Sequence, residues 1–152
     1  MSMATKVTFL FAAVLAPAEP ALAQGKIPQP NIIHVEVVGL HSDKGQVICA
    51  LYSSRDGFPK QNEKAVARVS SAITQKQAVC EFSEIAPGTY AISVFHDENS
   101  NGKLDTKFMG IPREGVGASN GAKGHFGPPK FESAAFSFLG GRLELKITIN
   151  YL

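Results

Sequence analysis

Hydrophobic and polar residues alternate along much of the chain with a period of two, the pattern of strands that are buried on one face. The alternation is clearest over residues 142–151, where leucine and isoleucine take every second position. Seven stretches bounded by Gly, Pro, Asn or Asp share the pattern: residues 31–40, 46–53, 65–73, 77–85, 89–96, 131–139 and 142–151. Seven short strands without a long helical period predict an all-β fold, a single antiparallel seven-stranded β-sandwich.

Two pairs of these strands look like hairpins. Residues 39–45 would turn the first strand into the second, and Gly140 with Gly141 forms a two-residue turn between the last two. Residues 97–130 break the pattern as one long glycine-rich loop, with seven glycines and three prolines. Its apolar residues are expected to fold back on the sheet: Phe108, Met109, Ile111 and Phe126.

The N-terminus has the features of a targeting segment. Lys6 precedes an apolar run over residues 7–16, which is too short to span a bilayer, and Ala21-Leu22-Ala23 follows as a small-x-small cleavage site. We therefore expect a signal peptide at residues 1–23, a single domain at residues 24–152, and export to the periplasm or the extracellular space.

The net charge and the hydropathy of the chain argue against several classes of partner. The formal net charge of +2 favours neither nucleic acid nor an anionic membrane. No later stretch is apolar enough for an integral membrane span, so the expected partner is an envelope protein or a small ligand. The sequence does not indicate an oligomeric state.

The two cysteines, Cys49 and Cys80, occupy core-facing positions of predicted strands. An even number of cysteines in an oxidising compartment favours a disulfide. The alternative is a pair of buried free thiols, since cysteine also packs as a small hydrophobic residue.

Residues 97–105, D-E-N-S-N-G-K-L-D, carry the candidate chemistry. They match the pattern D-x-[DN]-x-[DN]-G over six positions, and this alternation of oxygen ligands with a glycine suits Ca²⁺. The match ends at the twelfth position, where Phe108 replaces the bidentate glutamate of an EF-hand. The alternative is a plain polar turn, because Asn, Asp and Gly are common turn residues.

If Ca²⁺ binds, the ligands follow from the loop positions. Side-chain oxygens would come from Asp97, Asn99 and Asn101. Lys103 would offer its backbone carbonyl, and Asp105 its carboxylate. Glu114 is the only other acidic residue of the long loop outside this stretch, so it is the candidate for the missing ligand.

Three segments of the chain carry a family resemblance. They are P-G-T-Y-A-I-S-V-F-H-D-E-N-S-N-G-K-L-D from Pro87, F-M-G-I-P-R-E-G-V-G-A-S-N from Phe108, and G-P-P-K-F-E-S-A-A-F from Gly127. The chain closely resembles a family of exported bacterial proteins labelled as a domain of unknown function, over residues 32–149. The resemblance implies a transthyretin-like or carboxypeptidase-regulatory-like sandwich and no known activity. The two cysteines are not part of the family pattern.

These features favour a binding or accessory module over an enzyme. The alternative is a hydrolase that uses His96, His125 and the loop carboxylates for acid–base chemistry. His96 and Asp97 are neighbours on a strand and point to opposite faces, and no nucleophile elbow, zinc-spaced histidine pair or phosphate loop is present. We expect His96 to bond to the backbone at a strand end. A structural or adhesive envelope module is the third possibility.

Overall fold

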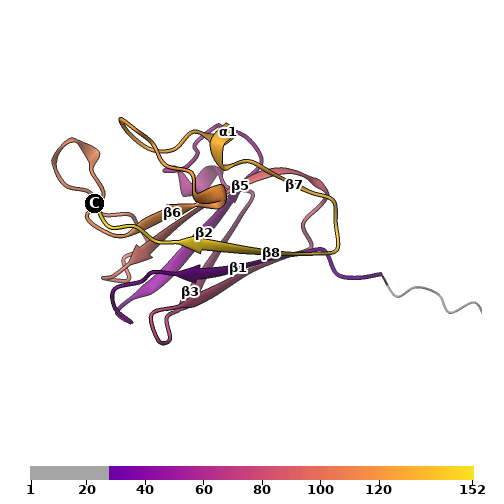
Figure 1. Cartoon of the computed structure of the whole chain (residues 1–152), viewed down its shortest axis with the longest axis horizontal. Coiled ribbons are helices and arrows are strands. Elements are labelled where there is room, and N and C mark those ends of the chain that lie inside the picture. The colour runs from indigo at the N-terminus through magenta and orange to yellow at the C-terminus, as the bar shows by residue number, and fades with distance from the viewer. Residues whose placement is uncertain (1–27) are drawn as a thin grey trace, which may run out of the picture.

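The computed structural model describes residues 28–152, in which two β-sheets face each other (Figure 1). The predicted signal peptide lies outside these residues. The strands are β1 (Ile32–Val38), β2 (Gln46–Tyr52), β3 (Ala67–Ala72), β4 (Ala78–Ser83), β5 (Gly88–Asp97), β6 (Val116–Ala118), β7 (Phe136–Phe138) and β8 (Arg142–Thr148). The helical segments are one turn of α-helix, α1 (Phe131–Ala134), and three 3-10 turns, η1 (Asn62–Lys64), η2 (Phe108–Gly110) and η3 (Ser119–Gly121). The all-β prediction is confirmed.

The prediction of seven strands is wrong, because the described residues contain eight. The three-stranded sheet has the order β4-β1-β8, and the five-stranded sheet has the order β3-β2-β5-β6, with β7 also paired to β5. The additional strand, β6, lies inside the long loop and pairs with residues 93–95 of β5. Three residues are too few to show an alternation in the sequence. The long loop is therefore interrupted by a piece of sheet.

The first predicted hairpin is also wrong. β1 pairs with β4 and β8, whereas β2 pairs with β3 and β5, so residues 39–45 carry the chain from one sheet to the other. Alternation shows which face of a strand is buried, but both sheets bury the same kind of face. The sequence pattern therefore could not show to which sheet each strand belongs.

The second predicted hairpin fails in the same way. Gly140 and Gly141 have the positive φ angles of the predicted turn, 96° and 74°. However, β7 pairs with β5, and β8 lies parallel to β1, so the sandwich is not wholly antiparallel. The Gly141 N–H donates to the Asn31 side chain, and its carbonyl accepts from Ile32, which fastens the turn to the start of β1. The strand predicted over residues 131–139 shortens to β7, because α1 occupies its first part.

One hydrophobic core lies between the two sheets. Its members come from β1, β2, β4, β5, β7, β8 and the segments that follow β1 and β8, including Val35, Leu51, Phe82, Ile92, Phe138 and Ile147. The predicted disulfide is confirmed: Cys49 in β2 and Cys80 in β4 are joined, with their Cα atoms 6.4 Å apart. The bond therefore links the two sheets through the core.

The apolar residues of the long loop do not fold back on the sheet as predicted. The exposed fraction is 88% for Phe108, 84% for Met109 and 106% for Phe126, and Ile111 is 47% exposed. Within residues 28–152, no helix has the length and hydropathy needed to cross a membrane.

Candidate functional site

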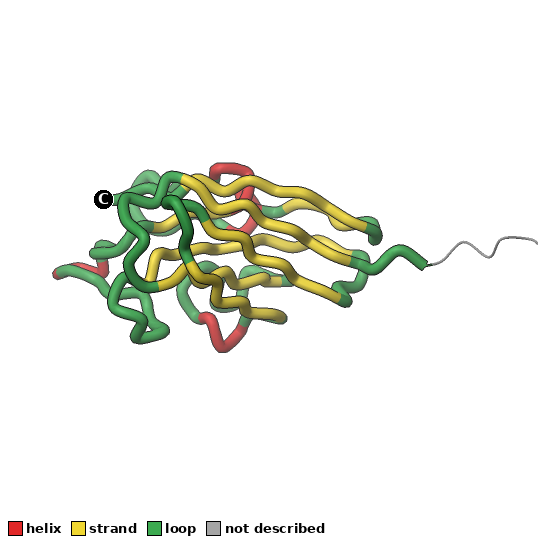
Figure 2. Tube along the Cα trace, turned by 90° about the horizontal axis from the view of Figure 1, so that it is seen from below, coloured by secondary structure: helices red, strands yellow, loops and turns green. Residues whose placement is uncertain are grey.

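The part of the long loop that precedes β6 lies with the C-terminus at one end of the sandwich, beyond the last residue of β5 (Figures 1 and 2). Two glycines allow this close packing. A Cβ on Gly45 would lie 2.0 Å from the Asp97 carbonyl oxygen, and Gly45 also has a φ of +71°. A Cβ on Gly115 would lie 2.6 Å from the ring of Tyr151. Larger residues at either position would separate the segments that form the site.

The Asp97 carboxylate organises the loop that follows β5. It is fully buried and accepts N–H groups of Asn101 at 3.0 Å and Gly102 at 2.9 Å. The Gln46 side-chain amide donates to the same carboxylate at 2.7 Å. Gly102 has a φ of 77°, the left-handed conformation that glycine adopts without strain. Asp97 therefore ties the loop to the start of β2.

The other side chains of residues 97–105 complete a network of hydrogen bonds. Asn99 and Asn101 accept backbone N–H groups with their amide oxygens, from Asn101 and Lys103 respectively. Their amide nitrogens donate to the Asp105 carboxylate, at 2.6 Å from Asn99 and 3.1 Å from Asn101. The amide nitrogens, rather than the oxygens, thus face the carboxylate of the predicted metal set.

Glu114, the predicted distant ligand, lies directly against this loop. It is 4% exposed and accepts the backbone N–H groups of Glu98 and Asp105, both at 2.9 Å. Within residues 28–152, the carboxylates of Asp97, Asp105 and Glu114 form no ion pair. The same three carboxylates do not gather within 4.8 Å of one another in the described part of the chain. The structure brings the predicted side chains together in one hydrogen-bond network, but it does not gather the three carboxylates around one point.

His96 points the opposite way from Asp97, towards the core. It is fully buried, and its Nε2 lies 2.6 Å from the carbonyl oxygen of Lys44, in keeping with the predicted backbone bond. Its Nδ1 lies 2.7 Å from the hydroxyl of Tyr151. The same hydroxyl accepts the backbone N–H of His41 at 3.1 Å. Tyr151 therefore connects the end of β5 with the segment after β1.

His41 and Glu98 complete a second polar cluster beside His96. The His41 ring stacks on Tyr151, with 3.9 Å between ring centroids, and its Nε2 contacts the Glu98 carboxylate. That carboxylate also lies 3.8 Å from Nδ1 of His96. His125 is exposed and belongs to neither cluster. Of the two histidines named for the hydrolase alternative, only His96 lies in the site.

A polar pocket of about 440 Å³ lies between the two clusters. It is lined by His41, Ser42, Lys44, Glu98, Asn99, Asp105, Arg113 and Glu114. The lining includes carboxylates, cationic side chains and an imidazole. Such a wall suits a small polar ligand that carries charge.

Burial raises the pKa of the Tyr151 hydroxyl above its ordinary value of 10.0. The N–H that His41 donates acts in the opposite direction, and the negative charge of Glu98 adds to the rise. The hydroxyl therefore keeps its proton in the folded protein and can donate it to His96.

A family model described as an uncharacterised protein conserved in bacteria (DUF2141) matches residues 35–146. The chain belongs to this family. No curated protein and no solved structure gives a significant match. The DUF2141 match begins in β1 and ends in β8, so it covers both sheets and both polar clusters except Tyr151. The family resemblance in the sequence is thus confirmed, and the DUF2141 description itself assigns no activity.

Sequence reasoning missed His41, Arg113 and Tyr151. His41 lies in a turn and Tyr151 follows the last strand, 110 residues later. Only the path of the chain between the sheets brings them together, so no local pattern could have paired them. A sequence signal did exist for the close packing, namely glycines at 45 and 115 beside charged residues.

Proposed function

We propose that this protein is an exported binding or accessory module, built as a transthyretin-like sandwich, whose ligand enters the polar pocket beside residues 97–105. Ca²⁺ stabilises this loop and thereby one wall of the pocket. The signal-like N-terminus, the disulfide between the sheets and the glycine-rich segment with acidic ligands support the proposal.

The observation that carries the proposal is the burial of acidic groups without a cationic partner. Asp97 is 0% exposed and Glu114 is 4% exposed, and neither forms an ion pair within residues 28–152. Taking a carboxylate out of water is costly unless opposite charge or hydrogen bonds compensate. Backbone N–H groups supply part of the compensation, and a divalent cation beside Asp105 would supply the rest.

Binding of Ca²⁺ would require a local rearrangement. The amide nitrogens of Asn99 and Asn101 now donate to Asp105, whereas Ca²⁺ requires oxygen ligands at about 2.3–2.6 Å. Turning both amides would break these two hydrogen bonds and also the two that their oxygens accept from the backbone N–H groups of Asn101 and Lys103. Because these bonds are lost, we expect weak binding, on the order of 10⁻⁴–10⁻³ M, as in extracellular modules.

The test is thermal unfolding of the mature protein with and without millimolar CaCl2. At a calcium concentration about tenfold above a Kd of roughly 10⁻³ M, binding to the folded state adds about 1.4 kcal/mol, so the melting temperature rises by a few degrees. Asp105→Asn keeps the size of the side chain and removes its charge, so this variant should lose the rise.

Asp56→Asn is the matched control, since Asp56 is an exposed loop carboxylate paired with Lys64 away from the pocket. This variant should keep the calcium-dependent rise. A wild-type melting temperature that CaCl2 does not change would overturn the calcium part of the proposal and leave a hydrogen-bonded turn.

The hydrolase alternative has one observation in its favour, the contact of His41 with Glu98 at the edge of the pocket. His125, which that alternative required, does not line the pocket. A screen with ester, peptide and phosphoester substrates tests it: turnover that His41→Ala abolishes would favour the enzyme over the binding module.

A further inference from the structure

The second polar cluster offers ligand atoms that differ from those of the six residues predicted for Ca²⁺. One ring nitrogen of His41, one of His96 and a carboxylate oxygen of Glu98 all lie within 4.8 Å of one another. Among residues 28–152, this is the only group of three such ligands. A single ion about 2.0–2.2 Å from each atom could bridge them if the Glu98 carboxylate turned from its direct contact with His41 and the imidazoles adjusted around the ion.

The hydrogen bonds of His96 fix which of its nitrogens is available. The Lys44 carbonyl oxygen can only accept, so Nε2 of His96 carries the proton and Nδ1 presents a lone pair. A metal-binding histidine commonly donates its other N–H to a backbone carbonyl in this way, which orients the ring. The lone pair on Nδ1 lies on the side of the Glu98 carboxylate, 3.8 Å away.

Tyr151 holds the two imidazoles in place. Its ring stacks on His41 at 3.9 Å with an angle of 14° between the planes, while its hydroxyl lies 2.7 Å from Nδ1 of His96. The hydroxyl oxygen lies where an ion bound to Nδ1 would sit, so an ion reaches this nitrogen only if the Tyr151 side chain moves aside or its oxygen becomes a further ligand. Tyr151 is therefore a positioning residue for both imidazoles in the metal-free protein.

The cluster combines one buried ligand with two partly exposed ligands. His96 is fully buried, whereas the side chains of His41 and Glu98 are 52% and 33% exposed and line the pocket. An ion could enter from the pocket, bind to a fixed histidine, and keep an open coordination position towards solvent. Cys49 and Cys80 are joined to each other, so no free thiol in residues 28–152 competes for the ion.

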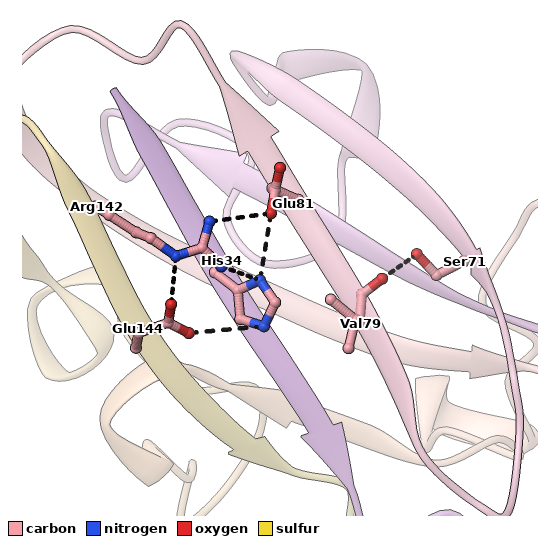
Figure 3. Close-up of polar contacts among 6 residues, drawn as sticks. All are labelled: His34, Ser71, Val79, Glu81, Arg142 and Glu144. Atoms are coloured by element: carbon pink, nitrogen blue, oxygen red, sulfur yellow. Dashed lines mark hydrogen bonds and ion pairs between the residues drawn. The ribbon is translucent and has the colours of Figure 1, made fainter. Parts of the chain in front are cut away.

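A second group of histidine and carboxylate side chains lies on the outer face of the three-stranded sheet and serves as a comparison, because it is an ion-pair network (Figure 3). His34 lies between Glu81 and Glu144, but these carboxylates approach different ring nitrogens, at 3.3 and 3.6 Å. Arg142 contacts His34 at 3.0 Å and also pairs with both glutamates. A fixed positive charge already pairs with both carboxylates of this cluster, whereas no arginine or lysine pairs with Glu98 in the described residues.

We propose that His41, His96 and Glu98 form a site for a divalent transition-metal ion, of the class of Zn²⁺ or Cu²⁺, at the inner wall of the pocket. Two imidazoles and one carboxylate are a ligand set that such ions bind well and that Ca²⁺, which takes oxygen ligands, does not. None of its three ligands is among the six residues proposed for Ca²⁺, although Glu98 lies within the calcium loop, between Asp97 and Asn99. The pocket would then place its ligand next to the metal ion.

The test is isothermal titration of the tag-free, disulfide-bonded protein with ZnCl2 and with CuCl2. Wild type should bind one ion per chain. His41→Ala removes an exposed ligand, so the variant should fold. Its affinity for the ion should fall by at least roughly tenfold to a hundredfold, because even the loss of a residue that hydrogen-bonds to a metal ligand has an effect of that size. Glu98→Gln should weaken binding in the same direction.

His34→Ala is the matched control, because it removes a histidine from the other histidine–carboxylate cluster and should leave the affinity unchanged. The electron paramagnetic resonance spectrum of the Cu²⁺ complex adds a structural readout: coupling to two imidazole nitrogens in wild type should fall to one in His41→Ala. Equal affinity of wild type and His41→Ala, or no binding by wild type, would overturn the proposal.

The two metal proposals can fail independently. Asp105→Asn should lose the calcium-dependent rise in melting temperature and keep Zn²⁺ binding, whereas His41→Ala should do the reverse. A Zn²⁺ affinity that falls in Asp105→Asn but not in His41→Ala would place the ion in the acidic loop and contradict the histidine site.

Discussion

At the scale of single residues, Asp97 does more than offer one ligand to a cation. Its carboxylate accepts three hydrogen bonds, from two backbone N–H groups and the Gln46 amide, in a fully buried position. The sequence identified the residue but not this role, because the pattern D-x-[DN]-x-[DN]-G is the same for a metal loop and for a turn held by its own side chains. The loop therefore depends on Asp97 even without an ion.

This leads to a prediction for the metal-free protein. Asp97→Ala removes the buried carboxylate that accepts three hydrogen bonds, so the free energy of unfolding should fall by about 2–4 kcal/mol in urea denaturation without calcium. The exposed residue Asp56 gives the comparison, since Asp56→Ala should cost no more than about 0.5 kcal/mol. If both variants unfold at the same urea concentration, Asp97 does not hold the loop.

A second prediction at this scale concerns alkaline pH. Burial raises the pKa of Tyr151 above 10.0, and burial likewise raises that of Tyr52. The two hydroxyl groups therefore lose their protons at a higher pH in the folded state than in the unfolded chain. This contribution to stability is therefore complete below pH 10.0 and is lost as pH rises through the folded-state pKa values. Tyr151→Phe should be less stable at neutral pH but should lose less stability on going to alkaline pH. Urea midpoints of both proteins on either side of pH 10.0 would measure the difference, and parallel declines would contradict it.

At the scale of elements, alternation predicted most strands but not their partners. Residues 142–148 form β8 as the leucine and isoleucine pattern indicated, and Cys49 and Cys80 face the core as their positions required. The hairpins failed because residues 39–45 and Gly140-Gly141 are crossings between sheets. The same limit applied to the prediction of the site. His96 and Glu98 lie in segments that the sequence pattern singled out, whereas His41 and Tyr151 come close to them only because the chain crosses between the sheets.

The disulfide gives the prediction for this scale. It joins β2 to β4 across a sequence separation of 31, and closing a loop of this size contributes roughly 3–4 kcal/mol in the chain-entropy model. Reduction should therefore lower the urea midpoint of wild type markedly. The double variant Cys49→Ala/Cys80→Ala should unfold early and respond to reductant no further. A wild-type midpoint unchanged by reductant would mean that the sheets hold together without the bond.

At the scale of the whole molecule, the prediction concerns where the mature chain begins. Lys6, the apolar run over residues 7–16 and Ala21-Leu22-Ala23 predict cleavage before Gln24. N-terminal sequencing of protein recovered outside the cytoplasm of a bacterial host should start at or next to Gln24. Recovery of the exported protein with Met1 intact would contradict the signal peptide.

The parallel pairing of β1 with β8 bears on the order of events during folding. The first strand of the structure lies between β4 and the last strand, so contacts with the largest separation in sequence complete the smaller sheet. Pairing over such distances must overcome the entropy of closing a long loop, and it slows folding. The smaller sheet is complete only when residues 142–148 are available to pair with β1. The sandwich therefore closes only after its last strand is present, and a chain truncated before β8 leaves an edge of β1 unpaired and prone to association.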